Sequence, residues 1–176
     1  MTNKEILDAT CGGRSIWHPE NKDRDDTLYI DKREEPPGFT TDGYDGYYES
    51  YSVAPDEVQD FRDLPYDDGS FNLVVFDPPH VIKDGGMESL AGAVQRKYGA
   101  LEAETWQEDL KAGFNELWRV LTPGGTLAFK FADNAADWDE VLELAPTKPL
   151  FGTTNSKRTG VETRWFVFYK PGGDST

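Results

Sequence analysis

Short apolar runs that end in glycine, proline or acidic residues recur along the chain, and each predicts a β-strand. Residues 6–8 run into a glycine pair, residues 28–31 form a second run, and residues 58–61 fit a short third strand. The strongest run is 71–76 (FNLVVF), and an unbroken apolar run of this kind is typical of a central parallel strand buried on both faces. Residues 126–131 and 164–170 predict two more strands.

Helical spacing appears between these runs. From Thr105 onward, apolar residues recur three and four positions apart up to Leu121, and Pro123-Gly124-Gly125 then predicts the end of a helix. Residues 137–144 predict a second, short helix. The stretch 36–53 is rich in glycine, tyrosine, proline and acids without any periodicity, so we expect a long loop whose tyrosines could form a lid.

Strands that alternate with helices predict an α/β fold, with a mostly parallel sheet and helices on both faces. At 176 residues the chain is expected to form one domain, residues 1–176, with the 36–53 loop as an insertion. The aromatic content of 13% argues against disorder. One cysteine and two histidines argue against a disulfide framework or a metal cluster, so no metal is expected.

The net charge of −15 has two interpretations: a surface for basic partners, or the solvated acidic shell of a halophilic protein. The acids are scattered through the chain, which favours the halophilic interpretation. The charge also weighs against nucleic-acid binding, because phosphate contacts need lysine and arginine. No apolar run is long enough to span a bilayer, and the first ten residues enter a strand directly, so we expect a soluble cytoplasmic protein without a membrane partner.

The end of the first strand carries a candidate cofactor loop, Asp8-Ala9-Thr10-Cys11-Gly12-Gly13. Small residues there let the backbone approach a ligand, and glycine permits a tight turn. Asp31 follows Asp8 by 23 positions, at the end of the second strand, where an acid commonly holds ribose hydroxyls. A phosphate loop of the GxxxxGK[ST] type is missing, so a nucleoside-containing cofactor other than a nucleotide triphosphate is indicated.

Two further groups of residues follow later strands. Asp60, with Phe61, precedes the strongest strand, and it could accept a hydrogen bond from an adenine amino group or simply cap a turn. Asp77-Pro78-Pro79-His80 follows that strand, and the prolines predict a rigid extended turn. Such a turn would present the Asp77 carboxylate and the Pro78 carbonyl as two acceptors for one NH2 group, leaving its lone pair free to attack a methyl group.

These motifs resemble those of class I S-adenosylmethionine (SAM)-dependent methyltransferases. The matching segments run from residue 4 to residue 131, and they are ILDATCGGR, LYIDKRE, QDFRDLP, VVFDPPH and LWRVLTPGGTLAFKF. The elements KYG, PLFG and the final strand extend the resemblance to small phage- and prophage-type methyltransferases, in which the DPPH segment corresponds to the DPPY motif of amino-methyltransferases.

The resemblance implies a Rossmann-like sheet of seven strands whose last strand is antiparallel, with SAM as cofactor. It also implies roles for single residues. Asp8 and Gly12 would line the methionine portion, Asp31 would hold the ribose, Asp60 and Phe61 would hold the adenine, and Asp77 would face the methyl group. The sequence departs from the family pattern twice: the first loop reads TCGGR in place of GxGxG, and His80 replaces an aromatic residue. His80 could stack on a base, accept a proton or be a polar loop residue.

The leading hypothesis is therefore a SAM-dependent N-methyltransferase acting on the exocyclic amino group of a nucleic-acid base, in DNA or RNA, with adenine or cytosine as the target. A protein side chain or a small molecule is the alternative acceptor, favoured by the acidic composition and by His80. A non-catalytic SAM-binding module is the alternative of another class, and the intact Asp77-Pro78-Pro79 argues against it. An NAD-type oxidoreductase is disfavoured by the DPPH turn and by the few glycines of the first loop.

Overall fold

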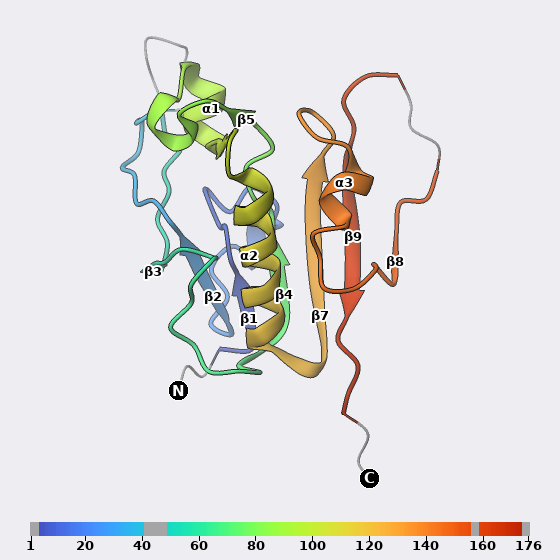
Figure 1. Cartoon of the computed structure of the whole chain (residues 1–176). Helices are drawn as coiled ribbons and strands as arrows, with labels where there is room; N and C mark the ends of the chain where they lie inside the picture. The colour runs from blue at the N-terminus through green and yellow to red at the C-terminus, as the bar shows by residue number, and fades with distance from the viewer. Residues whose placement is uncertain (1–3, 41–48, 156–158, 174–176) are drawn as a thin grey trace.

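The computed structural model describes residues 4–40, 49–155 and 159–173, and its centre is a sheet of seven strands in the order β3-β2-β1-β4-β7-β9-β8 (Figure 1). The strands are β1 (Ile6–Asp8), β2 (Thr27–Asp31), β3 (Glu57–Val58), β4 (Phe71–Phe76), β7 (Leu121–Ala132), β8 (Phe151–Gly152) and β9 (Thr163–Tyr169). All neighbouring pairs from β3 to β7 are parallel, whereas β9 runs antiparallel to both β7 and β8. The expected sheet, mostly parallel with an antiparallel last strand, is confirmed.

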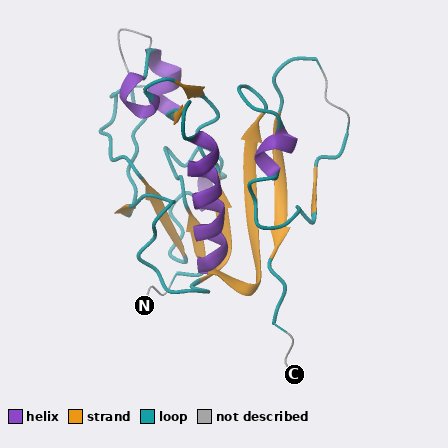
Figure 2. Cartoon of the chain, viewed as in Figure 1, coloured by secondary structure: helices purple, strands orange, loops and turns teal. Residues whose placement is uncertain are grey.

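The remaining elements connect these strands (Figure 2). Two short strands, β5 (Ile82–Lys83) and β6 (Leu101–Glu102), pair with each other outside the main sheet. The helices are α1 (Gly92–Tyr98), α2 (Trp106–Val120) and α3 (Trp138–Leu142), and two 3-10 turns are η1 (Pro19–Asn21) and η2 (Gly86–Ser89).

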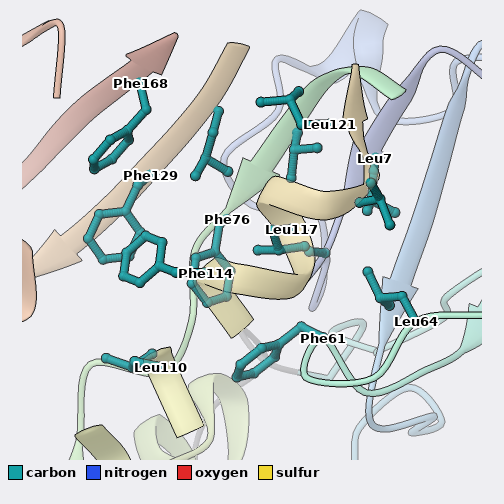
Figure 3. Close-up of a cluster of buried hydrophobic side chains, with 14 of the residues drawn as sticks. Leu7, Phe61, Leu64, Phe76, Leu110, Phe114, Leu117, Leu121, Phe129 and Phe168 are labelled. Atoms are coloured by element: carbon teal, nitrogen blue, oxygen red, sulfur yellow. The ribbon is translucent and has the colours of Figure 1, made fainter. Parts of the chain in front are cut away.

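The hydrophobic core lies between the sheet and α2. Phe76 of β4 and Phe129 of β7 both pack against Phe114 of the helix, with ring centroids 5.5 and 4.9 Å apart. Leu117 of α2 and Leu7 of β1 extend the same cluster, and all five side chains are fully buried (Figure 3). Burial of large aromatic and aliphatic side chains is the main stabilising contribution to such a fold.

Helical cover is unequal on the two faces. α2 and α3 lie on the same face (Figure 1). On the other face, the segment between β1 and β2 contributes η1 and places Trp17 against Asp8 and Tyr29. That segment is rich in charged residues and lacks apolar periodicity, so a 3-10 turn forms where a longer helix has no apolar face to bury.

Several predicted boundaries differ from the observed ones. The long helix ends at Val120 instead of at the Pro-Gly-Gly segment, because Leu121 already pairs with Phe71 as the first residue of β7. The third strand is Glu57–Val58 rather than 58–61, since Asp60 bridges to Asp63 in a tight turn. Of the expected 36–53 loop, residues 41–48, including Tyr44, Tyr47 and Tyr48, lie outside the described residues.

Candidate active site

A cavity of about 400 Å³ opens at the carboxyl ends of β1, β2 and β4. The strand order reverses between β1 and β4, and this switch point is where open α/β sheets bind their ligands. The volume falls in the range of small-molecule sites, about 300–1,000 Å³. Nine of the twelve predicted site residues line it: Thr10, Cys11, Gly12, Gly13, Asp31, Asp60, Phe61, Asp77 and Pro79.

The glycine pair after β1 forms the floor of this cavity. Gly12 has a left-handed backbone (φ 48°), and its N–H donates to Oδ2 of Asp31 at 2.9 Å. The N–H of Gly13 donates to the hydroxyl of Tyr51 at 3.0 Å, and the tyrosine ring lies directly over Gly13. A Cβ atom on Gly13 would be 2.3 Å from Cε2 of Tyr51, so this position requires glycine while the ring stays where it is.

Asp31 lies at the end of β2, where the sequence predicts a ribose-binding acid. Its side chain is almost fully buried, and Oδ1 accepts the backbone N–H of Arg33 at 2.9 Å. The Arg33 side chain also lines the cavity: its Nε lies 3.4 Å from Oδ1 of Asp31, and its guanidinium donates to the backbone carbonyl of Arg96 at 2.8 Å. This contact ties the end of β2 to α1, so the two walls of the cavity are held together.

Asp60 and Phe61 lie at the other end of the cavity. Burial alone would raise the pKa of Asp60, but hydrogen bonds from the Arg62 side chain and backbone lower it by more. The pKa of Asp60 therefore lies below its usual value. The Phe61 ring packs on Phe76 with 5.1 Å between centroids, and it also lies against Gly113 of α2, where a Cβ would be 2.4 Å from the ring. The result is an apolar wall beside a charged acceptor, which suits a planar base with an amino group.

Sequence reasoning missed the segment 81–102, which contributes the opposite wall. β5, η2, α1 and β6 fold above the sheet, and Met87, Ala100 and Leu101 line the cavity. Gly99 is left-handed (φ 79°), and a Cβ there would lie 2.8 Å from the Met87 sulfur. The Lys97-Tyr98-Gly99 motif is the one sequence signal in this segment, and its role in ending α1 explains the glycine.

The Asp77-Pro78-Pro79-His80 turn follows β4 as predicted, but only two of its four residues line the cavity. Asp77 and Pro79 line the cavity, whereas Pro78 and His80 do not. The His80 ring lies 5.0 Å from the ring of Phe131, and its Nε2 is 3.0 Å from Oδ1 of Asp77. His80 therefore faces Asp77 and Phe131 rather than standing free to stack on a ligand.

Lys130 approaches Asp77 from the neighbouring strand. Its Nζ lies 2.9 Å from Oδ2 of Asp77, and the backbone N–H of Asp77 donates to Oγ1 of Thr10, also at 2.9 Å. Lys130 is therefore in direct contact with the predicted catalytic carboxylate.

Asp8 is fully buried and does not line the cavity. Its Oδ2 accepts the indole N–H of Trp17 at 2.7 Å, and Oδ1 accepts the Thr10 N–H at 3.3 Å. Burial raises the pKa of Asp8 to about 7, despite these two hydrogen bonds. Asp8 therefore contacts the backbone of Thr10, which lines the cavity, but does not line the cavity itself, where the family resemblance would place it beside the methionine portion of SAM.

The neighbouring Cys11 lines the cavity as expected, with little of its surface exposed. Burial, followed by the nearby Asp8 and Asp31 carboxylates, raises the pKa of its thiol. A thiol of this kind stays protonated and is a poor nucleophile, which agrees with a packing role.

The described ranges contain no group of three or more histidine, cysteine, aspartate or glutamate side chains that could hold a metal ion. None of their helices is long and apolar enough to cross a membrane.

Comparison with known proteins gives likeness in structure only. No family model matches the chain, and no curated protein matches it in sequence. The PH0226 protein from Pyrococcus horikoshii OT3 aligns with 95% of this chain and 81% of its own, at 18% identity and a TM-score of 0.51. The [4+2]-cyclase SpnF aligns with 97% of this chain and 76% of its own, at 13% identity and a TM-score of 0.50.

A SAM-dependent methyltransferase from Methanosarcina mazei covers 98% of this chain and 94% of its own, at 14% identity and a TM-score of 0.49. Sequence identities this low are evidence for the fold alone. Together with the strand order and the single antiparallel strand β9, the two structures with TM-scores of 0.51 and 0.50 show that the chain has a Rossmann-like α/β fold.

Proposed function

We propose that this protein is a SAM-dependent N-methyltransferase whose acceptor is the exocyclic amino group of a nucleic-acid base. The observation that carries the proposal is the position of Asp77, which lines the cavity at the β1/β4 switch point and is followed by two prolines. Within the described residues, no hydrogen bond reaches the Pro78 carbonyl. In this proposal the Asp77 carboxylate and the Pro78 carbonyl are the two acceptors for an NH2 group, although Pro78 is not itself among the residues that line the cavity.

The cavity residues fit the parts of SAM. Asp31 offers a carboxylate at the end of β2, where a ribose would lie, and the apolar wall of Phe61 and Leu101 flanks the space for an adenine, with Asp60 at its edge. Bound SAM supplies a methyl group on a positively charged sulfur, and in the transfer an N–C bond forms as the C–S bond breaks and the sulfur keeps the electron pair.

The chain's own residues would position the amine and remove its proton. Asp77 and the Pro78 carbonyl accept its two N–H bonds, which leaves the nitrogen lone pair directed at the methyl group. After transfer the nitrogen carries a positive charge and must lose one proton. Asp77 is the group placed to accept that proton, and His80, whose Nε2 lies 3.0 Å from Oδ1 of Asp77, would hold the carboxylate in place.

The first experiment tests the cofactor and the acceptor separately. We expect wild-type protein to bind SAM in calorimetric titration, at both ordinary and molar KCl, and Asp31→Ala to lose most of that affinity. Asp31→Asn is the matched control, since it keeps one acceptor oxygen for the Gly12 N–H. If the folded wild-type protein binds no SAM in either salt, the assignment of the cofactor is wrong.

Transfer is then measured with tritiated SAM on unmethylated plasmid DNA, heat-denatured DNA and an RNA transcript, followed by nucleoside analysis. We expect label in methylated adenine or cytosine, and we expect Asp77→Ala to abolish it while SAM binding persists. Full transfer by Asp77→Ala would contradict the proposed mechanism.

A protein side chain or small molecule is the second candidate acceptor. The net charge of −15 favours it, because a polyanionic substrate must approach an acidic protein. The likeness to a [4+2]-cyclase also illustrates that this fold hosts more than one chemistry. Label in a lysine-containing peptide, with none in any nucleic acid, would favour this candidate.

A further inference from the structure

Asp77 is held at three points. Its backbone N–H donates to Thr10, and its two carboxylate oxygens contact different partners: Oδ2 meets Nζ of Lys130 at 2.9 Å and Oδ1 meets Nε2 of His80 at 3.0 Å. All three side chains are about four-fifths buried, with 18% of Asp77, 22% of Lys130 and 20% of His80 exposed. A carboxylate bonded on both oxygens cannot rotate freely, so its remaining lone pairs point in fixed directions.

Lys130 occupies an unusual place for a lysine. It lies in β7, between the fully buried Phe129 and Phe131, and is paired across the sheet with Trp165 of β9. A lysine that served only to cover apolar surface would extend its ammonium group into water. Here the ammonium group meets Asp77, and Lys130 is not among the residues that line the cavity. Its charge is therefore directed at the carboxylate and not at the cofactor space.

The pair changes the charge that an acceptor would meet. An isolated Asp77 would present a negative charge and attract a cationic amine, whereas the Asp77–Lys130 pair has no net charge. Asp8 also interacts electrostatically with Asp77, and because burial raises the pKa of Asp8 to about 7, it is only partly ionised at neutral pH. Neutral His80, with its proton on Nε2, would donate to Asp77 and add no charge.

We propose that Lys130 is a positioning residue for Asp77, one that fixes the carboxylate and cancels its charge so that the site accepts an uncharged amino group and disfavours an ammonium group. This inference rests on the proposed function. A carboxylate has about four acceptor positions, and two are used here, so room remains for an N–H of the acceptor. An amino group conjugated to an aromatic ring is uncharged at neutral pH, whereas a lysine side chain is charged and would have to lose a proton before it could attack.

The kinetic test compares Lys130→Met, which keeps the aliphatic chain, with Lys130→Arg, which keeps the charge. With plasmid DNA as acceptor, we expect Lys130→Met to lower kcat by about 100-fold, the size of effect that follows misplacement of a positioning group. KM for DNA and Kd for SAM should stay close to the wild-type values, because Lys130 touches neither space. Lys130→Arg should recover most of the activity.

A lysine-containing peptide serves as the cationic acceptor. We expect wild type to label DNA and leave the peptide unlabelled. An unchanged kcat in Lys130→Met would overturn the positioning role, and preferential labelling of the peptide by wild type would overturn the selection of an uncharged amine.

A second measurement decides the positioning role without SAM or an acceptor. The chain has two histidines, so the imidazole nitrogen resonances of His80 and of the exposed His18 can be told apart by substitution. Loss of the Lys130 charge should shift the His80 ring nitrogens and leave those of His18 in place, whereas Lys130→Arg should shift neither. The backbone amide spectrum shows whether each variant is folded.

The two kinds of failure are therefore separate. If no probe is methylated but the His80 resonances shift in Lys130→Met, the proposed function fails and the Asp77–Lys130 unit stands. If DNA is methylated and the His80 resonances of Lys130→Met match those of wild type, the function stands and the role of Lys130 is overturned.

Discussion

The buried carboxyl group of Asp8 makes the stability of this protein depend on pH in an unusual direction. Burial raises its pKa from the ordinary 3.8 to about 7, although Trp17 and Thr10 both donate to it. Between these two pH values the unfolded chain has released the proton while the native state still holds it. The native state then binds more protons, so the free energy of unfolding falls as pH rises.

The magnitude follows from the two pKa values. Each pKa unit corresponds to about 1.4 kcal/mol, so Asp8 should cost about 2.5 kcal/mol of stability between pH 5 and pH 8. Asp8→Asn resembles the protonated form in shape and charge. It keeps one acceptor for Trp17 or Thr10, loses the other, and should not titrate.

The assay is urea unfolding of wild type and Asp8→Asn at pH 5, 6, 7 and 8 in constant KCl. The difference in free energy of unfolding between the two proteins removes the titration of all other groups. We expect the variant to gain about 2.5 kcal/mol relative to wild type between pH 5 and pH 8. Asp25→Asn, at an exposed position shortly before β2, is the control for replacing an aspartate. A difference that stays constant across this range would refute the assignment of a protonated Asp8.

Two further predictions concern the cavity floor. Gly13→Ala should weaken SAM binding by more than tenfold in calorimetry, because its Cβ would come within 2.3 Å of the Tyr51 ring and displace it. Adding Tyr51→Ala to Gly13→Ala should restore part of the lost affinity. If Gly13→Ala binds SAM as tightly as wild type, the close approach of Tyr51 to residue 13 is unnecessary. Burial raises the pKa of the Cys11 thiol, so Cys11 should react with iodoacetamide at pH 8 only after unfolding in urea. Mass spectrometry measures this alkylation. Rapid alkylation of the native protein would contradict the buried, protonated thiol.

The sequence predicted the elements that apolar periodicity determines directly. The runs at 6–8 and 71–76 became β1 and β4, since an apolar run bounded by turn residues has few other ways to bury itself. Asp31 and Asp77 were predicted for the same reason, because each directly follows such a run and the carboxyl ends of parallel strands meet at one edge of the sheet.

The wall formed by residues 81–102 could not be predicted in this way. Its strands have two residues each and α1 has seven, so none is long enough to show a period. These elements are held by contacts from far along the chain, such as Arg33 with the carbonyl of Arg96 and Tyr51 with the carbonyl of Lys97. Such contacts depend on the finished fold, and local sequence carries little trace of them.

Asp77, which follows β4, is held by a residue that follows β1 and by a residue of β7. Thr10, after β1, accepts its backbone N–H and also donates its own N–H to Asp8, so the two acids are joined through one residue. Lys130, from β7, holds the opposite side. A change in the ionisation of Asp8 would reach Asp77 through Thr10 and through the electrostatic interaction between the two acids, whereas Lys130 contacts the Asp77 carboxylate directly. Transfer by Asp8→Asn should accordingly fall less than transfer by Lys130→Met, although Asp8 is the more deeply buried of the two.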